Sequence, residues 1–249
     1  MGSALDLLKL TDRYERKARL LPALLSVLAL APAAGALSPD SLTWLVSLPI
    51  GLGVVAVCAV GLSYAASAAG RRYELLLWPH WPDDSPTNRW LHPDDTASSQ
   101  QQKQLWYDAI KRLVGLDIPD TVGRGDESEV KQVINDAVRT LRHEFRNTEH
   151  SGLLASHNED YGFARNFAGL RVFWLPASVA SVVATWAAYL FMESALMWGV
   201  LALVILSLSL LLLCIMPGYV RQRAERYAES FFGTLSAVDK AAGDRSSVR

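Results

Sequence analysis

The hydrophobic residues of this chain form two long blocks separated by a polar segment. Each block consists of two uncharged runs with one acidic residue between them, Asp40 in the first block and Glu193 in the second. A helix needs roughly 20 predominantly apolar residues to cross a bilayer core of about 30 Å. Four runs meet this length, namely 20–39, 41–70, 172–192 and 194–220. The pattern therefore predicts four transmembrane helices in two hairpins.

The polar segments show helical periodicity and no convincing strand. Within 129–145 apolar residues recur at i, i+3, i+4 and i+7, which predicts an amphipathic helix, with Ser128 as a possible cap. A second helix is predicted over 100–113, and residues 115–128 are expected to form a turn-rich loop. Residues 153–171 are expected to continue without a break into the third span.

Two predicted spans extend beyond the apolar runs. The second is expected to continue through residue 77, until three prolines within 79–86 end it. The fourth continues over 221–238, where Tyr227, Phe231 and Leu235 share one stripe. The predicted fold is an all-α membrane protein in five segments. They are a cytoplasmic lead-in (1–19), a transmembrane hairpin (20–70), a mostly helical cytoplasmic domain (71–171), a second hairpin (172–220), and a cytoplasmic C-terminal helix and tail (221–249).

Charge fixes the expected orientation. All 24 Lys and Arg residues lie outside the apolar blocks, with 5 in 1–19, 13 in 71–171 and 6 in 221–249. Cytoplasmic loops carry the excess of basic residues. Both termini and the central segment are therefore expected in the cytoplasm, with the chain in a bacterial inner membrane.

The composition argues against catalysis and proton-coupled transport. The sequence lacks an HExxH, a GxSxG and a glycine-rich phosphate loop. The apolar runs contain no ionisable group of the kind that transporters place inside the membrane. We expect no enzymatic activity, no cofactor and no metal site.

The second span carries small residues at Gly61, Ala65 and Ala69. Small residues four apart let helix backbones approach closely in lipid. The stripe indicates either packing on the first span or a contact between copies of the chain.

The sharpest polar signal lies just before the third span. There, Arg165 and Arg171 are suited to phosphates, and Tyr161 or Phe163 to stacking on a base. The alternative is an interfacial elbow of aromatic and arginine anchors. With a local basic patch around Arg142, Arg146 and Arg165, the expected ligand or gating residues are Arg142, Arg146, Asn158, Tyr161, Arg165, Asn166 and Arg171.

The acidic residues between paired spans suggest a second feature. Asp40 and Glu193 are expected to ring the outer mouth of a pore and to favour cations. The alternative for Asp40 is a helix cap, and for Glu193 a tight turn.

Three sequence blocks carry a resemblance. The blocks are Pro-Thr-Asn-Arg-Trp-Leu at 86–91, Leu-Arg-His-Glu-Phe-Arg at 141–146, and 158–166, which contains Tyr-Gly-Phe-x-Arg-Asn. They look like those of a family of bacterial four-pass membrane proteins. The resemblance covers most of 71–171 and the flanking spans. Such an architecture resembles membrane effectors of anti-phage systems, in which a cytoplasmic domain senses a nucleotide or nucleic-acid signal and the spans disrupt the membrane.

The leading functional hypothesis is an oligomeric inner-membrane effector or channel gated by a cytoplasmic signal. The expected partners are the lipid bilayer, further copies of the chain, and a nucleotide, an oligonucleotide or a partner protein. The central segment holds 13 basic and 16 acidic residues, a balance that does not favour a non-specific nucleic-acid binder. The alternative is a non-conducting scaffold that recruits a cytoplasmic partner.

Overall fold

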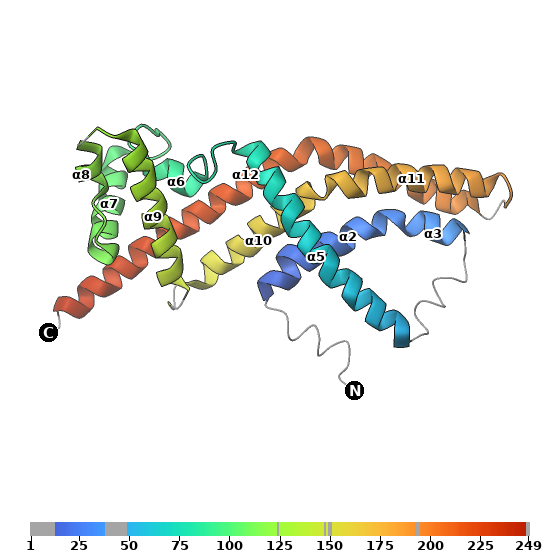
Figure 1. Cartoon of the computed structure of the whole chain (residues 1–249), viewed down its shortest axis with the longest axis horizontal. Coiled ribbons are helices and arrows are strands. Elements are labelled where there is room, and N and C mark those ends of the chain that lie inside the picture. The colour runs from blue at the N-terminus through green and yellow to red at the C-terminus, as the bar shows by residue number, and fades with distance from the viewer. Residues whose placement is uncertain are drawn as a thin grey trace. The chain divides into compact units, whose positions relative to one another are not determined.

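The computed structural model describes residues 13–37, 49–123, 125–146, 148, 151–192 and 195–247, with only the backbone at 49–60 and 245–247 (Figure 1). Every regular element within these ranges is a helix, and none is a strand. The predicted all-helical class is confirmed for this part of the chain.

The chain divides into two compact units, Met1–Glu74 with Glu159–Val220 and Leu75–Asn158 with Arg221–Arg249. These units differ from the expected segments, because 71–74 and 159–171 fall in the first unit and the C-terminal helix in the second. The helices that supply the first unit are η1 (Glu15–Leu20), α2 (Leu21–Val27), η2 (Leu28–Leu30), α3 (Ala31–Leu37), α5 (Pro49–Leu77), α10 (Ser151–Gly169), α11 (Arg171–Tyr189) and α12 (Leu196–Ser247).

Among the described residues, three helical stretches are long and apolar enough to cross a membrane: Glu15–Leu37, Arg171–Tyr189 and Leu196–Asp244. Large apolar side chains on them are exposed, including Val183, Trp186 and Leu203. Such a surface suits lipid rather than water. The expected span at 41–70 begins outside the described residues and continues in α5.

Small and hydroxyl-bearing residues join the apolar helices of the first unit. The Ser181 hydroxyl in α11 donates to the Ala29 carbonyl in η2 at 2.6 Å. Ser178 and Ser209 share a hydrogen bond of 2.9 Å between α11 and α12. In lipid, where apolar burial gives no advantage, close packing and such hydrogen bonds hold helices together.

The expected unbroken helix over 153–171 is wrong. Helix α10 ends at Gly169 and α11 begins at Arg171, with Leu170 at φ −70° and ψ 2° between them. The Trp174 indole donates to the Phe167 carbonyl at 3.0 Å, which satisfies an acceptor at the end of α10. Glycine, a poor helix former, marks the break.

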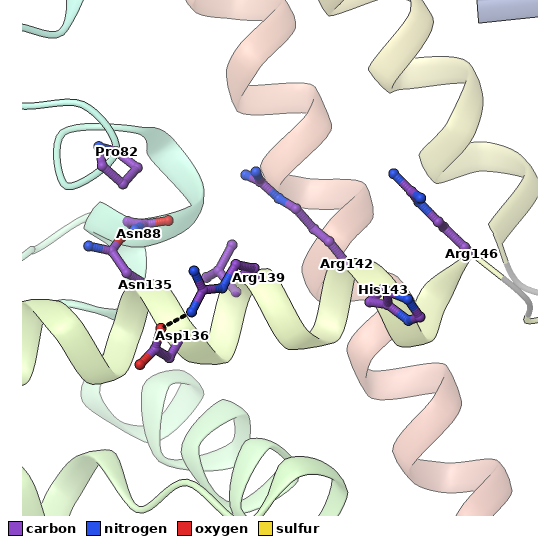
Figure 2. A pocket seen from close by; sticks show the side chains of 9 residues that line it. Pro82, Asn88, Asn135, Asp136, Arg139, Arg142, His143 and Arg146 are labelled. Atoms are coloured by element: carbon purple, nitrogen blue, oxygen red, sulfur yellow. Dashed lines mark hydrogen bonds and ion pairs between the residues drawn. The ribbon is translucent and has the colours of Figure 1, made fainter.

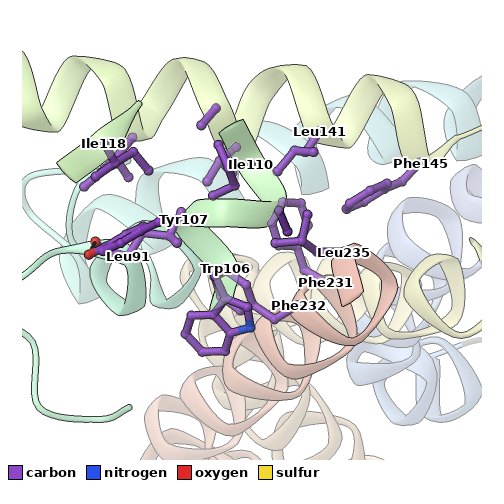
Figure 3. Close-up of a cluster of buried hydrophobic side chains, with 14 of the residues drawn as sticks. Leu91, Trp106, Tyr107, Ile110, Ile118, Leu141, Phe145, Phe231, Phe232 and Leu235 are labelled. Atoms are coloured by element: carbon purple, nitrogen blue, oxygen red, sulfur yellow. Dashed lines mark hydrogen bonds between the residues drawn. The ribbon is translucent and has the colours of Figure 1, made fainter. Parts of the chain in front are cut away.

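The second unit packs α6 (Pro86–Leu91), α7 (Gln100–Val114), α8 (Ile118–Gly123) and α9 (Glu127–Phe145) around the C-terminal part of α12. Its core contains Phe231 and Leu235, both fully buried, as the predicted stripe requires (Figure 3). The rings of Trp106 and Phe232 stack with centroids 4.0 Å apart. The C-terminal part of α12 therefore belongs to the core of this unit.

Local signals fix the ends of α7 and α9. The Ser99 hydroxyl accepts from the Gln102 amide at 3.2 Å, and Gly115 at φ 75° closes α7. Asp126, not the expected Ser128, caps α9 by accepting from the Ser128 amide at 2.9 Å. The loop expected at 115–128 contains the short helix α8.

Helix α7 holds the loop that follows α6. The ammonium of Lys103, whose residue is fully buried, donates to the carbonyl of His92 at 2.6 Å and also to those of Pro93 and Asp95. Burial lowers the pKa of Lys103, although the nearby carboxylate of Asp95 opposes this change. Three carbonyl acceptors compensate the buried charge.

We expect Tyr107→Phe to lower the free energy of unfolding by about 1 kcal/mol at neutral pH. The Tyr107 hydroxyl donates to the Leu91 carbonyl at 2.6 Å, and burial raises the pKa of Tyr107 to about 12. Because an unfolded tyrosine ionises near pH 10, the wild-type advantage should be complete below pH 10 and decline towards pH 12. Thermal unfolding of both proteins in detergent checks this, and a difference that stays constant up to pH 12 would contradict it.

Candidate functional site

The Tyr-Gly-Phe-x-Arg-Asn block lies in the part of α10 that belongs to the first unit. The Tyr161 hydroxyl donates to the Glu74 carboxylate of α5, and Arg165 Nη1 lies 3.2 Å from the same carboxylate oxygen. The Asn166 amide donates to the Ala18 carbonyl of η1 at 2.6 Å. The block therefore links α10 to both α5 and η1.

Glu74 is the centre of this polar cluster. Its residue is only 1% exposed, and Arg165 supplies the opposite charge. Burial by itself would lower the pKa of Arg165, but the Glu74 carboxylate, together with Tyr14 and Tyr161, raises the net pKa. The guanidinium thus stays charged and compensates the buried carboxylate.

Glycines bring the backbones of these helices together. A Cβ on Gly169 would lie 2.4 Å from the backbone of Ala69, and one on Gly162 would lie 2.8 Å from Ala18 Cβ. A Cβ on Gly70 would collide with Asn166. In contrast, a Cβ on Gly61, nearer the start of α5, would meet no atom within 4 Å. Of the predicted small-residue stripe, only the end near Ala69 makes a close contact of this kind.

Ion pairs extend the cluster to the first helix. Lys17 Nζ lies 2.7 Å from Asp160 Oδ1, and Arg13 Nε lies 3.2 Å from Glu159 Oε1. Arg171 stacks over the Tyr73 ring at 4.7 Å. We name Glu74, Tyr161, Arg165 and Asn166 the junction cluster. Its polar groups bind one another and the Ala18 carbonyl, so the cluster holds α10 against α5 and η1.

A pocket of about 580 Å³ lies in the second unit, along α9 (Figure 2). The residues that give it a basic character are Arg139, Arg142, His143 and Arg146, and Asn88 and Asn135 add amides. Figure 2 shows Arg142 and Arg146 extending in the same direction, while Arg139 turns back towards Asp136. The pocket is within the 300–1,000 Å³ typical of small-molecule sites.

Contacts of these arginines differ. Arg139 Nη2 donates to Asp136 at 2.6 Å, and Arg142 Nη2 donates to the Thr87 hydroxyl at 3.3 Å. The Arg142 guanidinium also lies 5.7 Å from the centre of the Tyr227 ring in α12. The exposed side chain of Arg146 has no hydrogen-bond or ion-pair partner among the described residues. We name this site, lined by Arg139, Arg142 and Arg146, the α9 pocket.

The predicted site residues thus fall into two groups. The structure brings Tyr161, Arg165 and Asn166 together in the first unit and Arg142 and Arg146 together in the second. Arg165 is not among the residues that line the α9 pocket. Asn158 lies half-buried in α10, and the proposed pore-mouth residues Asp40 and Glu193 lie outside the described residues.

Two important residues were absent from the sequence-based predictions. Arg139 precedes Arg142 and Arg146 by three and seven positions, so helical spacing placed it on their side of α9. No comparable signal marked Glu74, whose partner Arg165 lies 91 residues further along the chain. Only the tertiary fold shows that pairing.

Comparison with known proteins adds no assignment to this geometry: no family model, no curated protein and no solved structure matches the chain.

Proposed function

We propose that this chain is a non-enzymatic, oligomeric effector of the bacterial inner membrane, most simply a channel, gated by a cytoplasmic signal and acting in anti-phage defence. In this proposal the second unit and both termini face the cytoplasm, as the distribution of basic residues favours. The defensive role and the oligomeric state rest on the family resemblance.

The observation that carries the proposal is the continuity of α12. This helix runs from Leu196 to Ser247 and contains an apolar stretch of membrane-spanning length. Beyond Val220 the same helix supplies Phe231 and Leu235 to the core of the second unit. A change in that core therefore acts on a helix that is continuous with a candidate span.

Helix α9 provides the contact through which a signal reaches α12. The ring of Phe145, in α9, lies 5.2 Å from the ring of Phe231, in α12. Arg142, one turn earlier, reaches the ring of Tyr227. Because packed cores favour discrete arrangements over gradual deformation, a shift of α9 is expected to repack α12 as a unit.

The junction cluster supplies an element that gating has to rearrange. It fixes α10 against η1 and α5 through a buried ion pair and two hydrogen bonds. Such a cluster is stable when complete and costly when half-broken, which favours two states over a continuum.

We expect triggered cells to lose membrane potential, and a proline at position 221 of α12 to prevent this. Arg221 is exposed near the boundary between the units. Proline at 221, one turn after the native Pro217, removes a further helical hydrogen bond and adds a kink, whereas Arg221→Gln removes the same charge and keeps the helix. The measurement is a potential-sensitive dye in cells that express each variant, with and without phage infection.

The outcomes separate the hypotheses. Triggered depolarisation in the wild type and Arg221→Gln, but not in Arg221→Pro, supports gating through α12. An unchanged potential with intact wild-type protein in the membrane would reject the effector. That result would favour the scaffold, whose cytoplasmic partner should then co-purify in stoichiometric amount.

A further inference from the structure

We propose that the α9 pocket binds a small ligand through a phosphate group. The binding itself stands on the chemistry of the pocket, and its role as the gating signal rests on the function proposed above. The relevant class is a soluble phosphorylated metabolite or a phosphate-bearing lipid headgroup, since both offer the same anion.

The spacing of the arginines creates the site. Arg139, Arg142 and Arg146 are separated by three and four residues, which places them on one side of α9. They line a pocket of about 580 Å³, bounded opposite α9 by Pro82 and Asn88. Three guanidinium groups along one wall suit an anion with several oxygen atoms, because each guanidinium can donate two parallel hydrogen bonds.

The positive charge of the pocket is only partly compensated. Asp136 is the acidic residue among those lining it, and it already pairs with Arg139 at 2.6 Å. Neither Arg142 nor Arg146 is paired with a carboxylate among the described residues. An incoming dianion would therefore meet two uncompensated guanidinium groups.

Arg142 provides an independent indication of a ligand. Its Nε–H is buried and has no acceptor within the described structure, although Nη2 donates to Thr87. A buried donor left without an acceptor typically costs about 1–3 kcal/mol. A phosphate oxygen in the pocket would supply that acceptor.

The surroundings favour a small ligand over a long polyanion. The wall at Asn88 is fixed by its hydrogen bond to Asn135, which in turn donates to Asp83 at 2.8 Å. Asp83 and Asp136 would repel phosphates that extend past the pocket. Residues 71–171 contain 16 acidic and 13 basic residues, and this net negative charge also disfavours the binding of nucleic acid along the domain.

The pocket also has a direct connection to α12. Arg142 contacts both the pocket and the Tyr227 ring, so a phosphate that attracts its guanidinium competes with the contact to Tyr227. A ligand shifts a conformational equilibrium only when it interacts differently with the two states. Arg142 provides that difference.

The test is calorimetric titration of the full-length protein in phosphatidylcholine nanodiscs with pyrophosphate and, separately, with ATP. We expect Arg146→Gln and Arg139→Gln each to weaken binding roughly 10- to 100-fold, the loss for one charged hydrogen-bonding partner. Arg146 is exposed and unpaired among the described residues, so its replacement should not impair folding. Higher salt should weaken binding further.

The matched control is Arg112→Gln, which removes the same charge from α7, where Arg112 pairs with Asp239 at 2.6 Å outside the pocket. It should bind like the wild type. Vesicles containing phosphatidylglycerol test the headgroup source. The phosphate belongs to lipid if neither soluble probe binds the protein and if Arg146→Gln, but not Arg112→Gln, loses binding to these vesicles. Equal behaviour of Arg146→Gln and Arg112→Gln with every probe would overturn the proposal.

The phosphate site and the proposed effector function can each be rejected without rejecting the other. Binding that depends on Arg146, in a protein that never depolarises cells, would keep the phosphate site and reject the effector. Depolarisation that requires α12 continuity, without Arg146-dependent binding of any probe, would keep the effector and reject the site.

Discussion

Arg165→Met is expected to lower the free energy of unfolding by about 3 to 5 kcal/mol, the usual cost of removing one partner from a buried ion pair. Glu74 is 1% exposed, and Arg165 Nη1 lies 3.2 Å from its carboxylate. Methionine fills much of the volume of the arginine stem but brings no charge. Among the described residues, the Glu74 carboxylate would then keep only the hydrogen bond from Tyr161.

The double variant Glu74→Leu/Arg165→Met tests whether the loss comes from the uncompensated Glu74 carboxylate. Replacing both members of a buried ion pair with apolar residues is often neutral or stabilising. The double variant should therefore unfold closer to the wild type than Arg165→Met does. Arg19→Met is the matched control, because Arg19 forms a partly exposed pair with Glu15 at 3.2 Å on the first helix.

Thermal stability in detergent, followed by the loss of the monodisperse fraction, measures all four proteins. A large loss in Arg165→Met that is recovered in the double variant would identify the uncompensated carboxylate as the cause. If Arg165→Met and Arg19→Met lose the same small amount, the ion pair contributes little and the junction cluster is not a source of stability.

The features predictable from the sequence were those with a local cause. Apolar length marked three stretches that the structure shows as membrane-spanning in length, and periodicity marked α9 and the α12 stripe of Phe231 and Leu235. These patterns are repeated over many residues, so one misleading position does not hide them. The start of α9 was not predictable to the residue, since Asp126 and Ser128 are both suitable N-caps and only the fold selects Asp126.

The features that were not predictable depend on contacts between distant residues. Glu74 looked like one more polar residue in a helix extension, and its burial becomes clear only when α10 places Arg165 and Tyr161 beside it. Similarly, Gly169 closely approaches the backbone of Ala69 in α5, a contact between residues far apart in the chain that no local pattern indicates. The predicted basic patch combined Arg142 and Arg146, which belong to the second unit, with Arg165, which belongs to the first.

That close approach leads to the second large effect, expected for Gly169→Ala. In most helix interiors this change stabilises by up to about 1 kcal/mol, because alanine is the better helix former. At Gly169 the new Cβ would lie 2.4 Å from the Ala69 carbonyl carbon and oxygen, which belong to the backbone of α5. Backbone cannot move aside as a side chain can, so we expect a loss of roughly 3 kcal/mol, the upper part of the range for overpacking.

Gly61→Ala is the control that isolates this clash, since Gly61 lies in α5 itself and has nothing within 4 Å. It should be as stable as the wild type or slightly more stable. Thermal unfolding of both variants in detergent, with the yield of membrane-inserted protein, provides the comparison. If Gly169→Ala were as stable as Gly61→Ala, α5 and α10 would not approach as described. Loss of stability only in Gly169→Ala would instead show that α5 and α10 meet backbone to backbone, so any movement of α10 in the proposed gating would have to carry α5 with it or separate the pair.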